Sequence, residues 1–187
     1  MKTVLLAPLL LALASQAPAR GADPAPSGVK PLATIPSLDL KRYLGTWYEI
    51  AKFPNRFQKK CAGFTTATYS ARADGRVDVV NRCRRADGDT EVAQGVARQP
   101  DGPHSPKLEV RFVPAILSFV PMVWGDYWVI DLDPAYQLAA VSEPKREYLW
   151  ILSRTPTVDP AVYDALLGRL RAQGLDMNRM EPTKQAQ

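Results

Sequence analysis

The sequence predicts an all-β protein, an eight-stranded antiparallel up-and-down barrel with one C-terminal α-helix packed on its outside. Short runs rich in Val, Ile, Thr, Tyr, Phe and Trp recur from Gly45 to Arg154, and Gly, Pro and Asp residues separate them. Each run lies within turn distance of the next, which is typical of an antiparallel meander. Such a meander removes its exposed edges by closing on itself, so a barrel is favoured over an open sheet.

The local pattern places each element. Strands are expected near residues 45–53, 63–71, 76–84, 90–98, 107–113, 126–132, 136–142 and 147–154. Asp159 and Pro160 then supply a helix N-cap and a proline at the first helical position, and Gly174 ends the helix. The apolar residues at helical spacing are Val162, Leu166, Leu167 and Leu170. One amphipathic helix can bury this stripe only against the outside of the barrel. A last short strand near residues 177–180 is expected to return to the sheet.

The N-terminal residues 1–19 are predicted to be a secretory signal peptide. Lys2 precedes a short apolar run, and Ala17-Pro18-Ala19 forms a small-x-small cleavage site. The apolar run is too short to span a membrane. Residues 20–36 are rich in Pro, Ala, Gly and Ser and are expected to form a flexible lead-in. One domain over residues 37–180 and a C-terminal tail over 181–187 complete the expected organisation.

The composition is mildly basic, with a formal net charge of +5. Arg82, Arg84 and Arg85 form the one dense basic group of the sequence. A nucleic-acid site would need such a patch to be interleaved with exposed aromatic residues. A solvated strand end explains the three arginines equally well, so no nucleic-acid partner is expected. A second interpretation is that they face anionic lipid head groups.

The two cysteines, Cys61 and Cys83, are expected to form a disulfide, because the chain carries an export signal. They flank a predicted hairpin that turns near residues 73–75. Simple pairing about that turn places Cys83 opposite a residue near Phe64, so a bulge or a bend is needed to bring the sulfurs together. Two free thiols are the alternative. Two cysteines and the lone His104 are too few for a structural zinc site, and neither a metal nor a cofactor is expected.

Several motifs resemble those of the lipocalins, and most closely those of the branch that contains bacterial Blc-type lipocalins and apolipoprotein D. The opening motif is Leu38-Asp39-Leu40 followed by Tyr43-Leu44-Gly45-Thr46-Trp47-Tyr48-Glu49-Ile50. Further matches lie at residues 53–57, 66–70 and 79–81, and the most specific one is Tyr148-Leu149-Trp150-Ile151-Leu152-Ser153-Arg154-Thr155-Pro156. The resemblance covers residues 38–180.

The resemblance implies a lipocalin barrel with a closed end. There Gly45 opens the first strand and Arg154 lies across the ring of Trp47. A cation over an indole face contributes about 0.5 to 2 kcal/mol, which suits a structural plug. Of the family's Thr-Asp-Tyr turn motif only the aspartate remains, as Asp133. Many bacterial relatives carry a lipoprotein cysteine after the apolar run, and this sequence has none there. An exported, periplasmic protein without such an anchor, at most peripheral to the outer membrane, is therefore expected.

Strand alternation, together with the family pattern, predicts which side chains face the inside of the barrel. The residues expected to contact a ligand there are Glu49, Tyr69, Val79, Asn81, Val110, Phe112, Tyr127, Val129 and Trp150. The set is aromatic and aliphatic with a few polar groups, which suits an elongated apolar ligand with one polar end. The alternative is a solid barrel in which these residues fill the core.

The segment 113–124 connects two strands, yet eleven of its twelve residues are apolar or proline. Connecting loops are normally solvated, so something is expected to cover this one. Leu117 and Phe119 are expected to contact the ligand as part of a lid over the mouth. A homodimer contact and a transient membrane contact are the other interpretations.

The favoured function is a non-catalytic carrier of a fatty acid, a lysophospholipid or a similar hydrophobic ligand. Each buried methylene contributes roughly 0.8 kcal/mol, so an acyl chain supplies ample driving force. The resemblance adds lipid storage or transport for envelope maintenance as the setting. A lipocalin-type enzyme is the first alternative, with Glu49 as its inward carboxylate. A protein-interaction module that uses the segment 113–124 is the second, and a haem or metal carrier that depends on His104 is the third.

Overall fold

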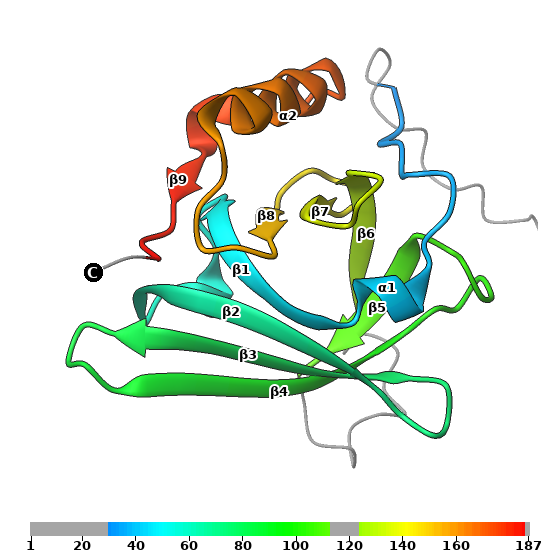
Figure 1. Cartoon of the computed structure of the whole chain (residues 1–187), viewed down its shortest axis with the longest axis horizontal. Helices are drawn as coiled ribbons and strands as arrows, with labels where there is room; N and C mark the ends of the chain where they lie inside the picture. Colours follow the sequence, from blue (N-terminus) through cyan, green and yellow to red (C-terminus); the bar gives the residue numbers. More distant parts are fainter. Residues whose placement is uncertain (1–29, 113–123, 186–187) are drawn as a thin grey trace, which may run out of the picture.

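The computed structural model describes residues 30–112 and 124–185, which form one closed antiparallel barrel (Figure 1). Its strands are β1 (Gly45–Lys52), β2 (Cys61–Ala71), β3 (Val77–Arg85), β4 (Thr90–Arg98), β5 (Lys107–Arg111), β6 (Gly125–Leu132), β7 (Leu138–Ser142), β8 (Leu149–Ser153) and β9 (Glu181–Pro182). They lie in the order β2-β3-β4-β5-β6-β7-β8-β1-β9, and β1 also pairs with β2. The additional pairing joins the two ends of the meander. The predicted eight-stranded up-and-down barrel is therefore confirmed.

The helix α2 (Pro160–Ala172) covers the outside of the barrel, as predicted (Figure 1). The side chain of Asp159 accepts hydrogen bonds from the backbone N–H groups of Ala161 and Val162, which fixes the start of the helix. Leu166 and Leu170 are fully buried against the barrel, whereas Val162 at the first turn stays half exposed. In residues 30–112 and 124–185, no helix is long and apolar enough to cross a membrane.

The short helices differ from the sequence prediction. The prediction of a strand near residues 177–180 is wrong, because η4 (Met177–Arg179) is a 3-10 turn and the strand β9 follows it. Asp176 explains the turn, since its carboxylate accepts a hydrogen bond from the backbone N–H of Asn178. The helix α1 (Leu40–Tyr43) and the 3-10 turn η1 (Arg56–Gln58) have no counterpart in the predicted elements.

The barrel carries two separate apolar layers. The inner layer fills the closed half of the barrel with side chains of α1 and of the strands: Leu38, Tyr43, Trp47, Ala67, Tyr69, Val77, Val79, Ala97, Leu108, Val129, Ala139, Val141 and Leu152. The outer layer lies between α2 and the outer faces of β6, β7 and β8: Leu32, Phe53, Ile130, Leu138, Ala140, Leu149, Ile151, Leu166, Leu170 and Leu175. Leu32 belongs to the expected lead-in, so the fold begins earlier than residue 37.

A seam interrupts the wall between β1 and β2. The two strands pair only from Gly45 with Tyr69 to Tyr48 with Thr66. Beyond that point the C-terminal residues enter the gap: Thr183 donates to the carbonyl of Ile50 at 2.8 Å, and Phe64 donates to the carbonyl of Lys184 at 2.6 Å. Gly63 permits this approach, because a Cβ there would lie 2.8 Å from the carbonyl oxygen of Lys184. Residues 181–185, expected to be a tail, are therefore part of the barrel wall.

Candidate ligand site in the barrel

The closed end is held by Arg154, whose guanidinium lies 3.9 Å from the centre of the Trp47 ring. The same guanidinium donates to the carbonyls of Arg42 and Leu44 at 2.8 Å, to that of Thr46 at 3.0 Å and to that of Tyr136 at 3.3 Å. Burial lowers the pKa of Arg154, although the neighbouring tyrosines partly offset the effect. Arg154 therefore ties α1 to the start of β1 and closes the floor of the barrel.

The other residues expected at the closed end lie beside Arg154. Gly45 has a φ of +94°, and a Cβ there would lie 3.2 Å from a nitrogen of Arg154. Asp133 shapes the turn between β6 and β7, because its carboxylate accepts hydrogen bonds from the backbone of Ala135, Gln137 and Leu138. The lost tyrosine of the turn motif thus leaves the role of the aspartate intact.

Above this floor, three tyrosine hydroxyls form a chain that crosses the barrel. The hydroxyl of Tyr127 lies 2.8 Å from that of Tyr43 and 2.8 Å from that of Tyr69. The three residues come from α1, β2 and β6. Burial raises the pKa of Tyr69 to about 12 and raises the pKa of Tyr43 and of Tyr127 well above the usual value, so all three hydroxyls keep their protons. In this hydroxyl trio three protons serve only two hydrogen bonds among the described residues, so one O–H group is free to donate elsewhere.

A second polar cluster, the Glu49 network, lies at the seam. One oxygen of the Glu49 carboxylate accepts from the hydroxyl of Thr183 at 2.6 Å, and the other accepts from the side-chain amide of Gln58 at 2.5 Å. Gln58 in turn accepts from the indole N–H of Trp150 at 2.9 Å. Burial raises the pKa of the Glu49 carboxyl, and the two hydrogen bonds lower it only in part. Gln185 spans the seam, donating to the carbonyls of Glu49 and Thr65.

Small side chains line the inner face of β4. Ala93, Gly95 and Ala97 alternate with outward-facing residues and pair with the inward-facing side of β3. Ala97 is buried, whereas Ala93 stays exposed although it faces the same way. Asn81 lies opposite Ala93 on β3, and its side-chain carbonyl oxygen is buried without a hydrogen-bond partner among the described residues. A buried acceptor of this kind needs a donor from elsewhere.

The other six expected ligand-contact residues fall into three groups in the structure. Val79 and Val129 are buried in the inner layer, and Val110 is partly buried there. Phe112 is 42% exposed, and its ring packs over Gly95. A Cβ added at Gly95 would lie 2.7 Å from the nearest atom of that ring. Leu117 and Phe119, like the rest of residues 113–123, lie outside the described residues.

An aromatic ladder links the inside of the barrel to its surface. The ring of Trp150 stacks on that of Tyr148 at 5.8 Å between centroids, and Tyr148 contacts Phe57 at 5.4 Å. Phe57 lies on η1 and is 62% exposed. Strand alternation puts Tyr148 on the same face as Trp150, whereas Phe57 joins them only through the fold of the β1–β2 connection.

The predicted disulfide between Cys61 and Cys83 is confirmed, with the two Cα atoms 5.5 Å apart. The register of β2 against β3 shifts between Cys61 and Gly63, and again between Gly63 and Thr66. These irregularities are the bulges that the hairpin register requires. The bond ties the beginning of β2 to the end of β3, beside the seam. Among the described residues, no group of three or more His, Cys, Asp or Glu side chains could hold a metal ion.

A closed antiparallel barrel of eight strands either fills its inside with side chains or holds one small ligand, and an apolar inner face with a few polar groups suits a ligand. Residues 38–185 match the family model of the lipocalin-like domain. The chain therefore belongs to the lipocalin family, whose members bind small hydrophobic ligands. The resemblance to the Blc-type and apolipoprotein D-like branch is confirmed.

Similar proteins come from plants and bacteria. Temperature-induced lipocalin-1 of Arabidopsis thaliana is 41% identical over 160 residues, which is 84% of each chain. Outer membrane lipoprotein Blc of Escherichia coli K12 is 39% identical over 172 residues, 91% of this chain and 87% of that protein. The crystal structure of apocrustacyanin C1 matches with a TM-score of 0.62 over 80% of this chain and 81% of that one, at 15% identity, and so supports the fold.

These relatives correct the expected location. The matched Blc proteins are outer membrane lipoproteins, so the prediction of an exported periplasmic protein without a lipoprotein anchor is wrong. The prediction depended on the lack of a cysteine after the apolar run of the first 19 residues. That stretch lies outside the described residues. The lack of a cysteine there does not outweigh the similarity to lipoproteins that align with up to 91% of the chain.

Proposed function

We propose that this lipocalin is a carrier that holds a fatty acid, a lysophospholipid or a similar single-chain lipid in the barrel, for lipid storage or transport. The observation that carries the proposal is the combination of an apolar inner face with hydrogen-bonding groups that have no partner among residues 30–112 and 124–185. The hydroxyl trio keeps one free donor, and Asn81 keeps one free acceptor. Unused polar groups inside a protein are costly unless a ligand or water completes them.

The positions of these groups suit a lipid with a polar end. Asn81 pairs with Ala67 across β2 and β3, and Tyr69 lies two residues along on the same face of β2. The free O–H of the trio would donate to a carboxyl or ester oxygen, and Asn81 would accept from a ligand hydroxyl. The acyl chain would lie along the small side chains of β4, where each buried methylene adds roughly 0.8 kcal/mol.

The Glu49 network favours a carrier over an enzyme. A general acid or base needs a raised or lowered pKa and also a free reach to the substrate. Burial does raise the pKa of Glu49, but both of its oxygens accept hydrogen bonds from Gln58 and Thr183. The carboxylate therefore has a partner for each oxygen within the protein and is suited to holding the seam.

A matched pair of variants tests the carrier function. Ala93 faces the inside of β4, and its neighbour Gln94 faces outward. We expect Ala93→Phe to fill the space beside Asn81 and to weaken the binding of a fluorescent fatty acid at least tenfold, about 1.4 kcal/mol. Gln94→Phe adds the same ring outside and should leave binding unchanged.

Titration of the fluorescent fatty acid reports the affinity, and native mass spectrometry of the purified full chain reports the mass of any retained lipid. Equal binding by Ala93→Phe and the unmodified protein, with both variants folded by circular dichroism, would show that the ligand does not use the barrel interior.

A further inference from the structure

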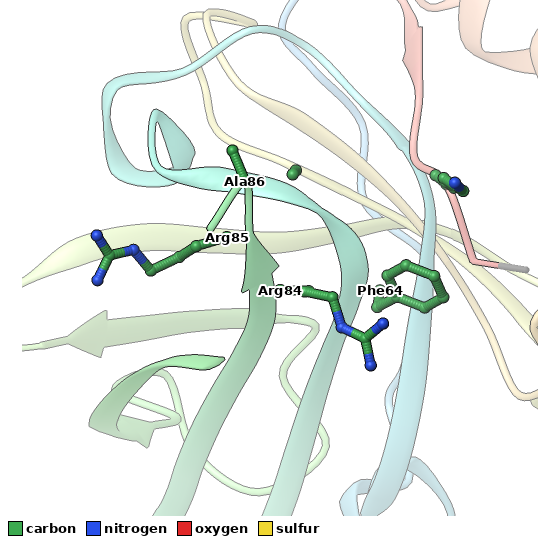
Figure 2. A pocket seen from close by; sticks show the side chains of 6 residues that line it. Phe64, Arg84, Arg85 and Ala86 are labelled. Carbon is green, nitrogen blue, oxygen red and sulfur yellow. The ribbon is translucent and has the colours of Figure 1, made fainter. Parts of the chain in front are cut away.

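A hollow of about 390 Å³ lies on the outside of the barrel beside the seam (Figure 2). It is lined by Ala62, Phe64, Arg84, Arg85, Ala86 and Lys184. Three of these six side chains are cationic, and none is acidic. The hollow is separate from the barrel interior, because the C-terminal segment and β2 lie between them.

Strand alternation explains why the cations gather outside. Cys83 faces inward and is buried, so Arg84 faces outward and is exposed, as is Arg82 two residues earlier. The C-terminal segment follows the same rule, because Thr183 and Gln185 reach inward to the Glu49 network. Lys184 between them therefore extends to the outer side, next to Phe64, whose backbone N–H bonds to its carbonyl.

Three cations of this surface lack acidic partners among the described residues. Among residues 30–112 and 124–185, no ion pair includes Arg82, Arg84 or Lys184. Arg85 differs, because its guanidinium pairs with Asp87 at 2.9 Å. Figure 2 shows Arg85 extending away from Phe64, whereas Arg84 lies against it. The charge of Arg82, Arg84 and Lys184, which we call the seam cations, is therefore available to an external partner.

The contact between Arg84 and Phe64 orients the guanidinium. Its centre lies 4.7 Å from the centre of the phenyl ring. A stacked guanidinium keeps its N–H donors at the edge of the plane, where they can bind two oxygens of one phosphate. Phe64 has a φ of 54°, a left-handed conformation that is rare for an aromatic residue, and the bulged start of β2 holds it there. The ring thus forms an apolar base under a phosphate-binding edge.

We propose that the seam cations and the hollow beside Phe64 form a docking site for an anionic lipid surface, with a headgroup phosphate held between Arg84 and Lys184. The inference rests on the proposed carrier function, because a hydrophobic ligand has to be taken from or delivered to a lipid surface. Charge complementarity identifies the partner, since basic residues near an anionic membrane each strengthen binding. The site differs from the apolar segment 113–124, since it acts through charge and lies on described strands.

The test measures partition of the full chain onto sedimented lipid vesicles, composed either of phosphatidylcholine alone or with about a third phosphatidylglycerol. We expect the protein to bind the anionic vesicles and to leave the neutral ones in solution. Arg84→Gln and Lys184→Gln should each reduce the partition coefficient about fivefold, and the double variant about 25-fold. High salt should release the protein.

The matched control removes two charges elsewhere. Lys41 on α1 and Arg171 on α2 are exposed, so Lys41→Gln with Arg171→Gln changes the net charge equally. An equal loss in this control would overturn the site, because net charge alone would then explain the binding. Equal partition onto neutral and anionic vesicles would overturn it too. Tight binding of inorganic phosphate without vesicles, lost in Arg84→Gln, would assign the hollow to a soluble phosphate instead of a membrane.

Binding of the fluorescent fatty acid in solution separates the two proposals. The double variant Arg84→Gln with Lys184→Gln should retain it, because neither side chain faces the barrel interior. Retained fatty-acid binding with no preference for anionic vesicles would overturn the docking site alone. If the unmodified protein does not bind the fatty acid, the carrier function is overturned, whatever the vesicle experiment shows.

Discussion

The closed end and the rest of the barrel interior differ in how completely their polar groups are paired. At the closed end, Arg154 donates to four backbone carbonyls, and the indole N–H of Trp47 donates to the carbonyl of Tyr43 at 2.8 Å. In the rest of the interior, both oxygens of Glu49 have partners, but the buried side-chain oxygen of Asn81 has none among the described residues. Saturated polar groups stabilise a fixed structure, whereas unused ones indicate a place where the protein meets something else.

This contrast separates stability from binding within one barrel. Three large side chains, Trp47, Tyr43 and Leu38, are fully buried where α1 covers the floor. The opposite side contains a short 3-10 turn, an exposed Phe57 and a wall completed by the chain's own C-terminal segment. Substitutions in the two regions should therefore differ in the property they change, stability or binding, as well as in the size of the effect.

The largest effect is expected for Arg154→Ala. The substitution removes the stacking on Trp47 and leaves several carbonyls without their donor, so we expect the free energy of unfolding to fall by about 3 to 5 kcal/mol. Urea denaturation measures it. Arg42→Ala is the control, because Arg42 also stacks on an aromatic ring at this end, that of Tyr136 at 3.9 Å, but on the surface. A loss below about 1 kcal/mol is expected there. Similar losses in the two variants would refute the closing role of Arg154.

The next effect is expected at the disulfide. Cys61→Ala with Cys83→Ala releases a cross-link between residues 22 apart in the sequence. The loss of that constraint on the unfolded chain should lower stability by about 3 kcal/mol. Reduction of the unmodified protein should give the same loss, measured by denaturation with and without a reductant. Unchanged stability after reduction would mean that the seam side holds together without the bond.

A smaller effect is expected for the hub of the hydroxyl trio. Tyr127→Phe removes two hydrogen bonds and leaves the hydroxyls of Tyr43 and Tyr69 without their common partner, so we expect a loss of about 2 kcal/mol. Tyr69→Phe removes one bond and should cost about half as much. Identical stability losses would contradict the central position of Tyr127.

The pairing of Trp47 with Arg154 at the closed end was predicted through the resemblance to the lipocalins, whereas helix α1 on the floor was not predicted. Trp47 and Arg154 stand at the ends of two strands whose β-propensity is clear, and Asp159 with Pro160 marks a helix start. The wall of β4 gave no such signal. Its outward Val92 and Val96 are more apolar than its inward Ala93 and Gly95, so hydrophobic alternation there favours the wrong face.

The Glu49 network could not be found from the sequence either. Gln58 lies in a connection and Thr183 lies 134 residues from Glu49, so only the three-dimensional fold brings the three side chains together. The C-terminal residues carry no strand pattern in the sequence. They join the barrel only because β1 and β2 leave a gap, in which these residues form hydrogen bonds to both strands. Sequence reasoning placed Glu49 inside the barrel but missed the groups that hold its carboxylate.

The smallest effect tests Glu49 through pH. The folded state raises the pKa of this carboxyl above its usual value of 4.5, so the native protein binds more protons than the unfolded chain between the two values. The contribution of Glu49 to stability therefore falls as the pH rises through that window, by up to about 1.4 kcal/mol per pH unit. Glu49→Gln, which cannot ionise, should remove this slope, as measured by urea denaturation across the acidic to neutral range. Glu181→Gln on the same seam, where the side chain is exposed, should keep the slope. A slope that survives in Glu49→Gln would show that the carboxylate is compensated by Gln58 and Thr183, and the seam side would then resemble the closed end.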